Sequence, residues 1–292
     1  MGKTRLDLAR KEIAGFLEDS GQTVFSLRDL GEIYRENSQA WRLAMSTSRS
    51  SFADYLCQKR ILQKIDIPFG EKKVFTRYAL RGRFARVEVY LSLVASAYLS
   101  HYTAMGYHQL TEQMPKTYYV NHELTPKHIT PNQLTQEGID VAFAKAPRVS
   151  RTVAEYKGDR IVLLNSKSAN GLGIIEEPWE RGFVRMTNPE RTLIDCMVKP
   201  EYAGGVYEVA KAFKLANGRA STNTMYAMLK KLDYVYPYHQ VLGFYLELAK
   251  FDSVILKRLA AMPMPHDFYL THGMVDPDYS EKWKLYYPKS FF

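Results

Sequence analysis

Cysteine is scarce in this chain of 292 residues, which contains only Cys57 and Cys196, far apart and without metal-ligand spacing. Two isolated thiols are typical of proteins in a reducing compartment, where structural disulfides are rare. No run of 18 apolar residues occurs, which argues against a membrane span, and charges throughout the first 19 residues argue against a secretory signal peptide. We therefore expect a soluble, cytoplasmic protein with no membrane partner.

Motifs for cofactors and metals are also missing. The segment Gly171-Leu172-Gly173 lacks the third glycine and the following helix that a phosphate-binding loop needs. The seven histidines are scattered, with neither an HExxH pattern nor a cysteine partner. His101 and His108 are seven residues apart, and we expect them to pack or cap rather than to hold a metal. The sequence therefore predicts no cofactor and no metal site.

Positive charge is what the chain has in excess, and it is unevenly distributed. The chain carries 40 Lys and Arg against 31 Asp and Glu, a net charge of +9. The first 90 residues hold 17 basic and 11 acidic residues, net +6, whereas the remaining 202 hold 23 and 20, net +3. An excess of one sign in one third of the chain indicates a polyanionic partner for that third.

The basic third is typical of three short helices followed by a basic hairpin. Apolar residues recur at helical spacing between residues 6 and 17, Ser26 and Asp29 form a capping-box pattern, and the polar run 46–51 precedes a third helical segment. A short extended stretch is expected at 23–25, and residues 65–67 and 72–78 predict two strands about a turn. This is the order of a winged helix-turn-helix domain, which we assign to residues 1–87. The alternative is a small helical subdomain whose basic residues only solvate its surface.

This order assigns candidate contacts to double-stranded DNA. Hydroxyls and backbone N–H groups at the start of the third helix would bind phosphate, and Arg49 would read a guanine edge in the major groove. Basic side chains of the hairpin would hold the DNA backbone. The candidate DNA-binding residues are Thr47, Ser48, Arg49, Ser50, Lys59, Arg60, Lys72, Lys73 and Arg77.

Residues 88–292 predict a second domain of mixed α/β structure with a helical end, so the expected fold class is α+β. We expect a helix at 88–99, strands at about 117–187, including one at 139–143, and helices at about 189–262. Asn188 before Pro189 predicts a helix cap, and the tyrosine-rich tail from residue 267 is expected to pack back in extended form.

One pattern in this second domain suggests catalysis. Asp140 at the end of a predicted strand, with Glu155 and Lys157 on the next, follows the layout of Mg²⁺-dependent nucleases. The carboxylates would hold the metal and the lysine would stabilise developing charge. Such a short pattern arises often by chance, and Lys157 also suits a turn, so we favour a protein that is not an enzyme.

Three segments carry a resemblance to a known family. They are MTNPERTLIDCMVKPEYAGGVYEVAKAF (186–213), LSHYTAMGYHQLTEQMPKTYYV (99–120) and YPYHQVLGFYLELA (236–249). They resemble the AbiEi-type antitoxins of type IV toxin–antitoxin and phage abortive-infection systems. The resemblance implies a winged helix-turn-helix repressor that binds inverted repeats in its own promoter, and a C-terminal domain that counters a nucleotidyltransferase toxin encoded alongside.

Two features of the resemblance bear on the reading of single residues. Compared with the shorter members of this family, the chain has an extra run at residues 36–45, before the helix that is expected to enter the major groove. Arg191 lies in the Asn-Pro-Glu-Arg block, where it could pair with Glu190 or Asp195 or reach a partner, and we favour a structural role. A third functional hypothesis is a protein-interaction module whose aromatic C-terminal half sequesters a partner, while the basic region binds RNA or an acidic protein face.

Overall fold

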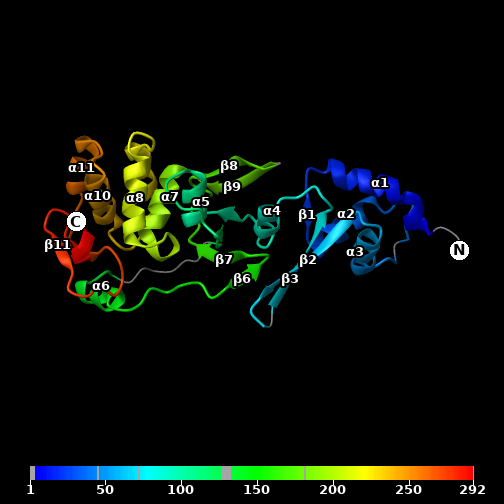
Figure 1. Ribbon diagram of the computed structural model, residues 1–292, viewed down its shortest axis with the longest axis horizontal. Helices are drawn as coiled ribbons and strands as arrows, with labels where there is room; N and C mark the ends of the chain where they lie inside the picture. The colour runs from blue at the N-terminus through cyan, green and yellow to red at the C-terminus, as the bar shows by residue number, and fades with distance from the viewer. Residues whose placement is uncertain (1–3, 45, 72, 126–132, 181, 292) are drawn as a thin grey trace. The chain divides into compact units, whose positions relative to one another are not determined.

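The computed structural model describes residues 4–44, 46–71, 73–125, 133–180 and 182–291. It comprises two compact units (Figure 1). The first contains residues 1–97, 152–161 and 178–184, and the second contains residues 98–151, 162–177 and 185–292. Helices and sheets occur along the chain, which confirms the predicted mixed α+β class. No helix in the described ranges is long and apolar enough to cross a membrane.

The first unit contains helices and an antiparallel sheet. Its elements are α1 (Arg5–Asp19), β1 (Val24–Phe25), α2 (Leu27–Asn37), α3 (Arg49–Gln58), β2 (Leu62–Phe69), β3 (Lys73–Leu80), α4 (Arg86–Leu91) and β6 (Val153–Tyr156). Strands β1, β3 and β2 form the sheet in that order, with Phe69 opposite Lys73 at the end of the β2–β3 hairpin. The three predicted helices, the extended stretch and the hairpin are all confirmed as secondary structure, and β6 lies against β2.

Short-range hydrogen bonds define where two of these helices begin. At α2 the Asp29 N–H donates to Ser26 Oγ (3.1 Å) and the Ser26 N–H donates to Asp29 Oδ2 (2.7 Å). Thr4 and Asp7 form the same reciprocal pair at the start of α1. Each such cap stabilises a helix by about 0.5–2 kcal/mol, so these starts are encoded locally.

The described part of the run at residues 36–45 contributes to the core of the first unit. Trp41 and Leu43 are buried, and the ring centroid of Trp41 lies 5.5 Å from that of Phe16. Tyr34 Oη donates to the Ala44 carbonyl oxygen (2.6 Å), which ties the run back to α2. Residues 38–44 are therefore packed structure between α2 and α3, while Met45 lies outside the described residues.

The second unit combines strands with a helical cluster. Its helices are α5 (His101–Tyr107), α6 (Gln136–Phe143), α7 (Pro189–Val198), α8 (Val206–Ala216), α9 (Thr222–Leu232), α10 (Tyr238–Leu248) and α11 (Ser253–Ala260), with short 3-10 turns at Pro200–Tyr202 and Lys289–Phe291. Its strands are β4 (Tyr98–Leu99), β5 (Thr117–Glu123), β10 (Phe268–Tyr269), β11 (Asp278–Ser280) and β12 (Leu285–Tyr287). The strands β7 (Asp159–Ser166), β8 (Ile174–Trp179) and β9 (Gly182–Thr187) each have residues in both units.

The main sheet is mixed. Its order is β6-β7-β5-β4-β9-β8, and β4 pairs antiparallel with β5 and parallel with β9. The turn that Lys157 was expected to suit is confirmed, and Lys157 and Gly158 both have positive φ (50° and 85°) between β6 and β7. Such a pair of positive φ values suits a two-residue hairpin.

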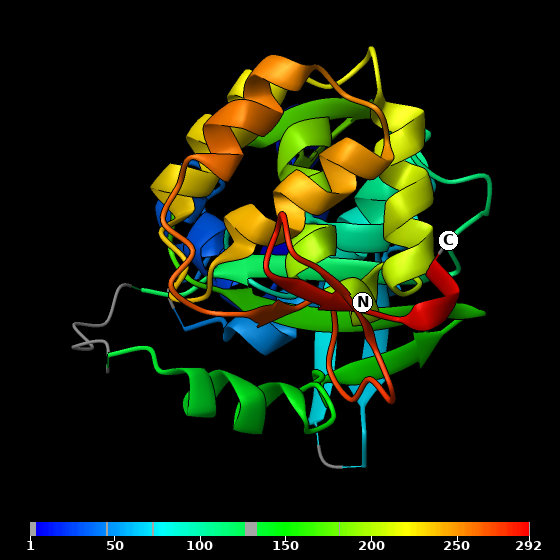
Figure 2. The ribbon, with the colours of Figure 1, turned by 90° about the vertical axis from the view of Figure 1, so that its left-hand side faces the viewer.

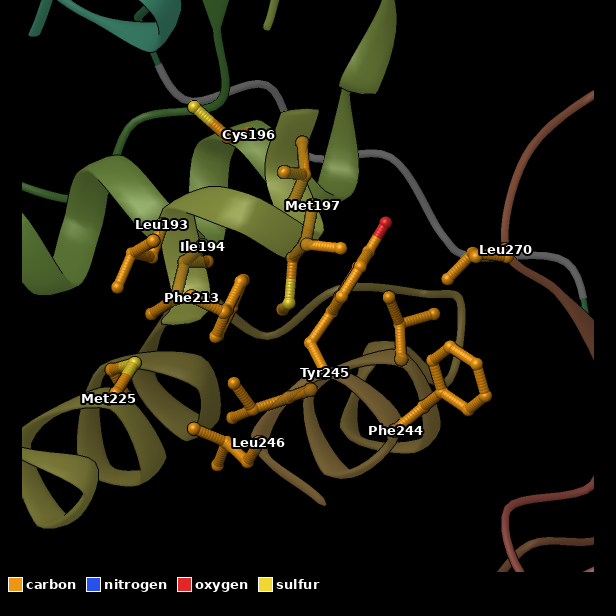
Figure 3. Packing of buried hydrophobic residues seen from close by; sticks show 14 of the residues in the cluster. Leu193, Ile194, Cys196, Met197, Phe213, Met225, Phe244, Tyr245, Leu246 and Leu270 are labelled. Carbon is orange, nitrogen blue, oxygen red and sulfur yellow. The ribbon is translucent and has the colours of Figure 1, made fainter. Parts of the chain in front are cut away.

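Apolar side chains of α7, α8 and α10 form the core of the helical cluster (Figure 3). Phe213 and Tyr245 stack with ring centroids 5.0 Å apart. The C-terminal strand β12 lies against α10 (Figure 2), and the predicted extended tail is confirmed as three short strands. Trp283 is fully buried against Gly243, where a Cβ would come 2.1 Å from the indole ring. Only glycine leaves room for that ring.

Two predicted elements are wrong. The helix expected at 88–99 ends at Leu91, and Tyr98–Leu99 is a strand with neighbours on both sides in the sheet. Both residues are fully buried, and a short apolar run of this kind has no periodicity that separates a strand from a helix. The strand expected at 139–143 is instead the end of α6, which begins where Thr135 Oγ1 accepts from the Gly138 N–H.

Helix α7 contains the one buried ion pair that the described residues show with both side chains below 10% exposure. Its predicted cap is confirmed, because Asn188 Oδ1 accepts from the Arg191 N–H (2.9 Å). Arg191 Nε donates to Asp195 Oδ1 (2.8 Å) and Nη1 to the Leu172 carbonyl oxygen (2.7 Å), with the side chains 2% and 7% exposed. Burial opposes the charge of Arg191, but Asp195 outweighs it and raises the pKa of the guanidinium. The structural role favoured for Arg191 is confirmed.

Candidate nucleic-acid interface

Helices α2 and α3 approach each other closely at Gly31. A Cβ placed on Gly31 would lie 3.2 Å from the Cβ of Arg49, the first residue of α3. The aliphatic stem of Arg49 therefore crosses the surface of α2, and glycine on α2 leaves the space for it. This contact fixes the direction in which the first turn of α3 presents its side chains.

The hydroxyl run before α3 caps that helix. Ser48 Oγ accepts from the Ser51 N–H (3.1 Å) and lies 2.9 Å from Ser50 Oγ and 2.8 Å from Ser51 Oγ. Ser48 and Ser50 are exposed, while Thr47 is half-buried. The hydroxyls thus lie at the positive end of the α3 dipole, where phosphate oxygens bind favourably.

Arg49 is exposed, and its guanidinium makes no hydrogen bond or ion pair with any residue that the structure describes. Its five N–H donors are in a planar array that matches the O6 and N7 atoms of guanine or two phosphate oxygens. A charged group that is anchored by its stem and has free donors is arranged for an external anion.

Lys59 and Arg60 end α3 and differ in their surroundings. Lys59 Nζ lies 2.7 Å from Asp7 Oδ1 of α1, and Tyr55 Oη donates to the same oxygen (3.2 Å). Lys59, followed by Thr4, holds the pKa of Asp7 far below its usual range, and burial raises the pKa of Tyr55 to about 12. Arg60 is exposed with a φ of 59° and is unpaired within the described part of the chain. Of the two, only Arg60 has a charge without an acidic neighbour.

The hairpin residues also separate into different groups. Lys73 is exposed, with Nζ 4.4 Å from the ring centroid of Phe75, and Lys72 lies outside the described residues. Arg77 Nη1 donates to the Thr76 carbonyl oxygen (2.7 Å), while Nε and Nη2 donate to Ser92. Burial lowers the pKa of Arg77. Arg77 therefore holds β3 to the segment after α4, and Lys73 is the hairpin cation whose ammonium is available.

Sequence reasoning missed the role of Asp7 and Tyr55. Asp7 was visible only as an acidic residue three positions after Thr4, which indicates a helix cap. Its second interaction, with Lys59, joins residues 52 positions apart, and no local pattern predicts such a pair. The consequence is that α1 fixes the end of α3 and neutralises one of the predicted DNA contacts.

The catalytic alternative loses its expected framework. Asp140 is in a helix rather than on a strand, and its Oδ1 accepts from Gln136 Nε2 (2.8 Å) and Tyr269 Oη (2.9 Å). Glu155 pairs with Arg160 (3.4 Å), and Lys157 is in the turn between β6 and β7. No group of three or more His, Cys, Asp or Glu side chains in the described ranges is arranged to hold a metal ion.

The two histidines singled out in the sequence pack inside the second unit, and each makes a hydrogen bond there. His101 Nδ1 lies 2.8 Å from Ser100 Oγ, and His108 Nε2 lies 2.7 Å from the Thr187 carbonyl oxygen. Burial lowers the pKa of His101 to about 4, so its imidazole is neutral at physiological pH. These side chains contribute to packing in the second unit.

Comparison with known proteins identifies a similar fold and no family. No protein-family model matches the chain, and no curated protein matches it. The chain is similar in structure to the RV2827C protein from Mycobacterium tuberculosis, with a TM-score of 0.52 and 11% sequence identity over 95% of this chain and 90% of that one. At this identity the similarity concerns the fold alone, over nearly the whole of both chains.

Proposed function

We propose that this protein is a non-enzymatic DNA-binding regulator whose residues 1–87 act as a winged helix-turn-helix domain. The observation that carries the proposal is Arg49, which has free guanidinium donors at the N-terminus of the second helix of a close-packed pair. A helix placed this way can enter the major groove with its first turn against the bases. The antiparallel hairpin β2–β3 then acts as the wing.

In this proposal the contacts divide by task. Arg49 reads a base edge, since a bidentate pair with guanine discriminates against other bases by about 1–3 kcal/mol. Ser50 and the N–H groups of the first turn of α3 bind phosphate. Lys73 and Arg60 supply charge to the DNA backbone. Arg77 is no longer among the proposed contacts, because its donors already bind Ser92 and Thr76.

We further propose that the protein is the antitoxin of a type IV toxin–antitoxin system that represses its own promoter. The support is the resemblance of residues 99–120, 186–213 and 236–249 to AbiEi-type antitoxins. Residues 88–292 then form the domain that counters a nucleotidyltransferase toxin. Because Arg191 and Asp195 are buried, the Asn-Pro-Glu-Arg block that carries the resemblance builds the domain and leaves the outer surface of the domain to meet a partner.

Fluorescence anisotropy with the protein's own upstream DNA tests the regulatory role. Arg49→Gln should reduce the preference for that DNA over a shuffled duplex by roughly five- to 150-fold, the equivalent of about 1–3 kcal/mol. The matched control is Arg28→Gln on α2, whose guanidinium is exposed but already paired with Glu32 (2.9 Å). An Arg49 variant with the preference of the wild type, or a control that loses as much, would refute the proposed recognition helix.

Co-expression with the nucleotidyltransferase gene that the proposal places beside this one tests the antitoxin role separately. The proposal predicts that the full chain restores growth and that Arg49→Gln still does so when expressed from an unrelated promoter. Growth arrest in the presence of the wild-type chain would contradict the antitoxin assignment and leave DNA binding intact.

A further inference from the structure

A pocket of about 230 Å³ lies between α9, α10 and the segment that joins them, all within the second unit. Four tyrosines line it, namely Tyr226, Tyr234, Tyr236 and Tyr238, together with Lys230 and His239. Such a space accommodates one planar ring system with a small substituent.

The tyrosine rings give the pocket aromatic walls. The centroids of Tyr234 and Tyr238 lie 5.2 Å apart at 73°, and those of Tyr236 and Tyr238 lie 6.3 Å apart at 82°. Edge-to-face packing of this kind holds the rings in fixed orientations. Fixed aromatic walls favour a flat aromatic ligand, because stacking on them is worth about 1–3 kcal/mol for a nucleic-acid base.

Two cations lie beside Tyr226, one of the rings that line the pocket. Lys230 Nζ lies 5.7 Å from the ring centroid of Tyr226, and the guanidinium of Arg258, a residue of α11, lies 4.4 Å from the same centroid. Lys167 Nζ donates to the Asp233 carbonyl oxygen (3.0 Å) and lies 3.7 Å from Asp233 Oδ2, so these two charges form a pair. Asp233 is the acidic residue of the pocket lining and is paired with Lys167, so Lys230 and Arg258 leave this side of the pocket with a net positive charge. A ligand with an anionic group is favoured there.

His239 adds a third preference. Burial lowers its pKa, so the ring is neutral at physiological pH, while a hydrogen bond to the Pro263 backbone occupies one side of the ring. Nε2 is buried and has no hydrogen-bond partner among the described residues. In the neutral ring the nitrogen opposite the donating N–H is an acceptor. An N–H donor on the ligand would satisfy this nitrogen, whose unpaired state is otherwise costly.

We propose that this pocket binds a nucleoside monophosphate. The base stacks among the tyrosine rings and donates an N–H to His239 Nε2, while the phosphate lies at the rim near Lys230 and Arg258. A nucleotide combines a flat ring, a ring or exocyclic N–H donor and an anionic group in one small molecule. This site is separate from the proposed DNA-binding surface, and its existence does not depend on the antitoxin assignment.

Isothermal titration of the full chain with AMP, GMP, CMP and UMP tests the proposal. At least one should bind with a Kd below about 1 mM. Its phosphate-free nucleoside should bind at least fivefold more weakly, because a charge-assisted contact at the rim is lost. Phenyl phosphate, which has the ring and the anion but no N–H donor, should also bind at least fivefold more weakly.

Substitutions locate the site. Lys230→Met should remove most of the advantage that the phosphate confers, whereas Lys214→Met, an equally exposed lysine in the last turn of α8, should change nothing. Tyr226→Leu should weaken binding of nucleotide and nucleoside alike, with circular dichroism showing that the helices remain. The proposal is overturned if none of the four nucleotides binds, if Lys214→Met has the same effect as Lys230→Met, or if only an RNA oligonucleotide binds.

Discussion

Replacing Arg191 with methionine should destabilise the second unit severely. The side chain is 2% exposed and forms two hydrogen bonds of 2.8 and 2.7 Å, to Asp195 Oδ1 and to the Leu172 carbonyl oxygen. Removing the cation leaves the Asp195 carboxylate buried at 7% exposure with no counter-charge. Breaking a buried pair on one side typically costs about 3–5 kcal/mol.

A second variant separates the loss of the pair from the loss of packing. Arg191→Met combined with Asp195→Leu removes both charges and fills similar space, so it should recover most of the stability, to within about 1 kcal/mol of the wild type. The single variant should lower the melting temperature by roughly 6–20 °C, at about 2–4 °C per kcal/mol for a chain of this size.

Urea unfolding followed by circular dichroism measures both free energies. If the free energy of unfolding of the single variant lies within about 1 kcal/mol of the wild-type value, the ion pair does not hold α7 in place. If the double variant is no more stable than the single one, the damage comes from lost packing, and the reasoning about an unpaired carboxylate is wrong.

Three further predictions concern other parts of the fold. Between pH 6.5 and about 4 the unfolded state binds a proton at His101 and the folded state does not. The free energy of unfolding should therefore fall as the pH falls, by about 2–3 kcal/mol at pH 4.5. Urea unfolding at pH 7 and pH 4.5 should show this loss, and His101→Asn should reduce it. Gly243→Ala should lower the free energy of unfolding by at least about 1–3 kcal/mol, because the added methyl group meets the buried indole of Trp283. Gly15→Ala, which has open space around it, should instead stabilise α1 by up to about 1 kcal/mol. Equal effects of the two variants in thermal unfolding would contradict this. Asp7→Asn should release Lys59 for DNA, so that binding becomes tighter and its salt dependence becomes steeper by about one phosphate contact. Adding Lys59→Met to this variant should cancel the gain. Unchanged DNA affinity of Asp7→Asn would exclude Lys59 from the interface.

Sequence patterns predicted those elements whose boundaries are set by neighbouring residues. The caps at Ser26, Ser48 and Asn188 are short-range hydrogen bonds, and each helix begins where its cap places it. The turn at residues 157–158 follows from local backbone preference in the same way. Such features depend on a few consecutive residues and are therefore visible before any tertiary structure is known.

The elements that were wrong depend on distant partners. Tyr98–Leu99 is a strand because β5 and β9 lie on either side of it, and these are encoded far along the chain. Residues 139–143 contain enough β-branched and aromatic side chains to suggest a strand, but they form a helix in which Asp140 and Phe143 contact Tyr269 and Phe268, far along the chain. In both cases the local preference was weak and the surrounding structure decided.

The candidate interface shows the same division. The start of α3 was predictable from its hydroxyls and from Arg49. The sequence did not predict which of the cations remain free. Lys59 is paired with Asp7, 52 positions away, and Arg77 binds Ser92, 15 positions away. The basic surplus of the first 90 residues therefore overstates the number of side chains available to a polyanion.

Sequence-specific DNA binding is measured by comparing two duplexes at one salt concentration. Equilibrium titration of the full chain against its own upstream DNA and against a shuffled duplex of equal length and composition should give dissociation constants that differ by at least about a thousandfold. Equal affinity for the two duplexes, or no binding to either at physiological salt, would contradict the proposal that α3 reads a base sequence.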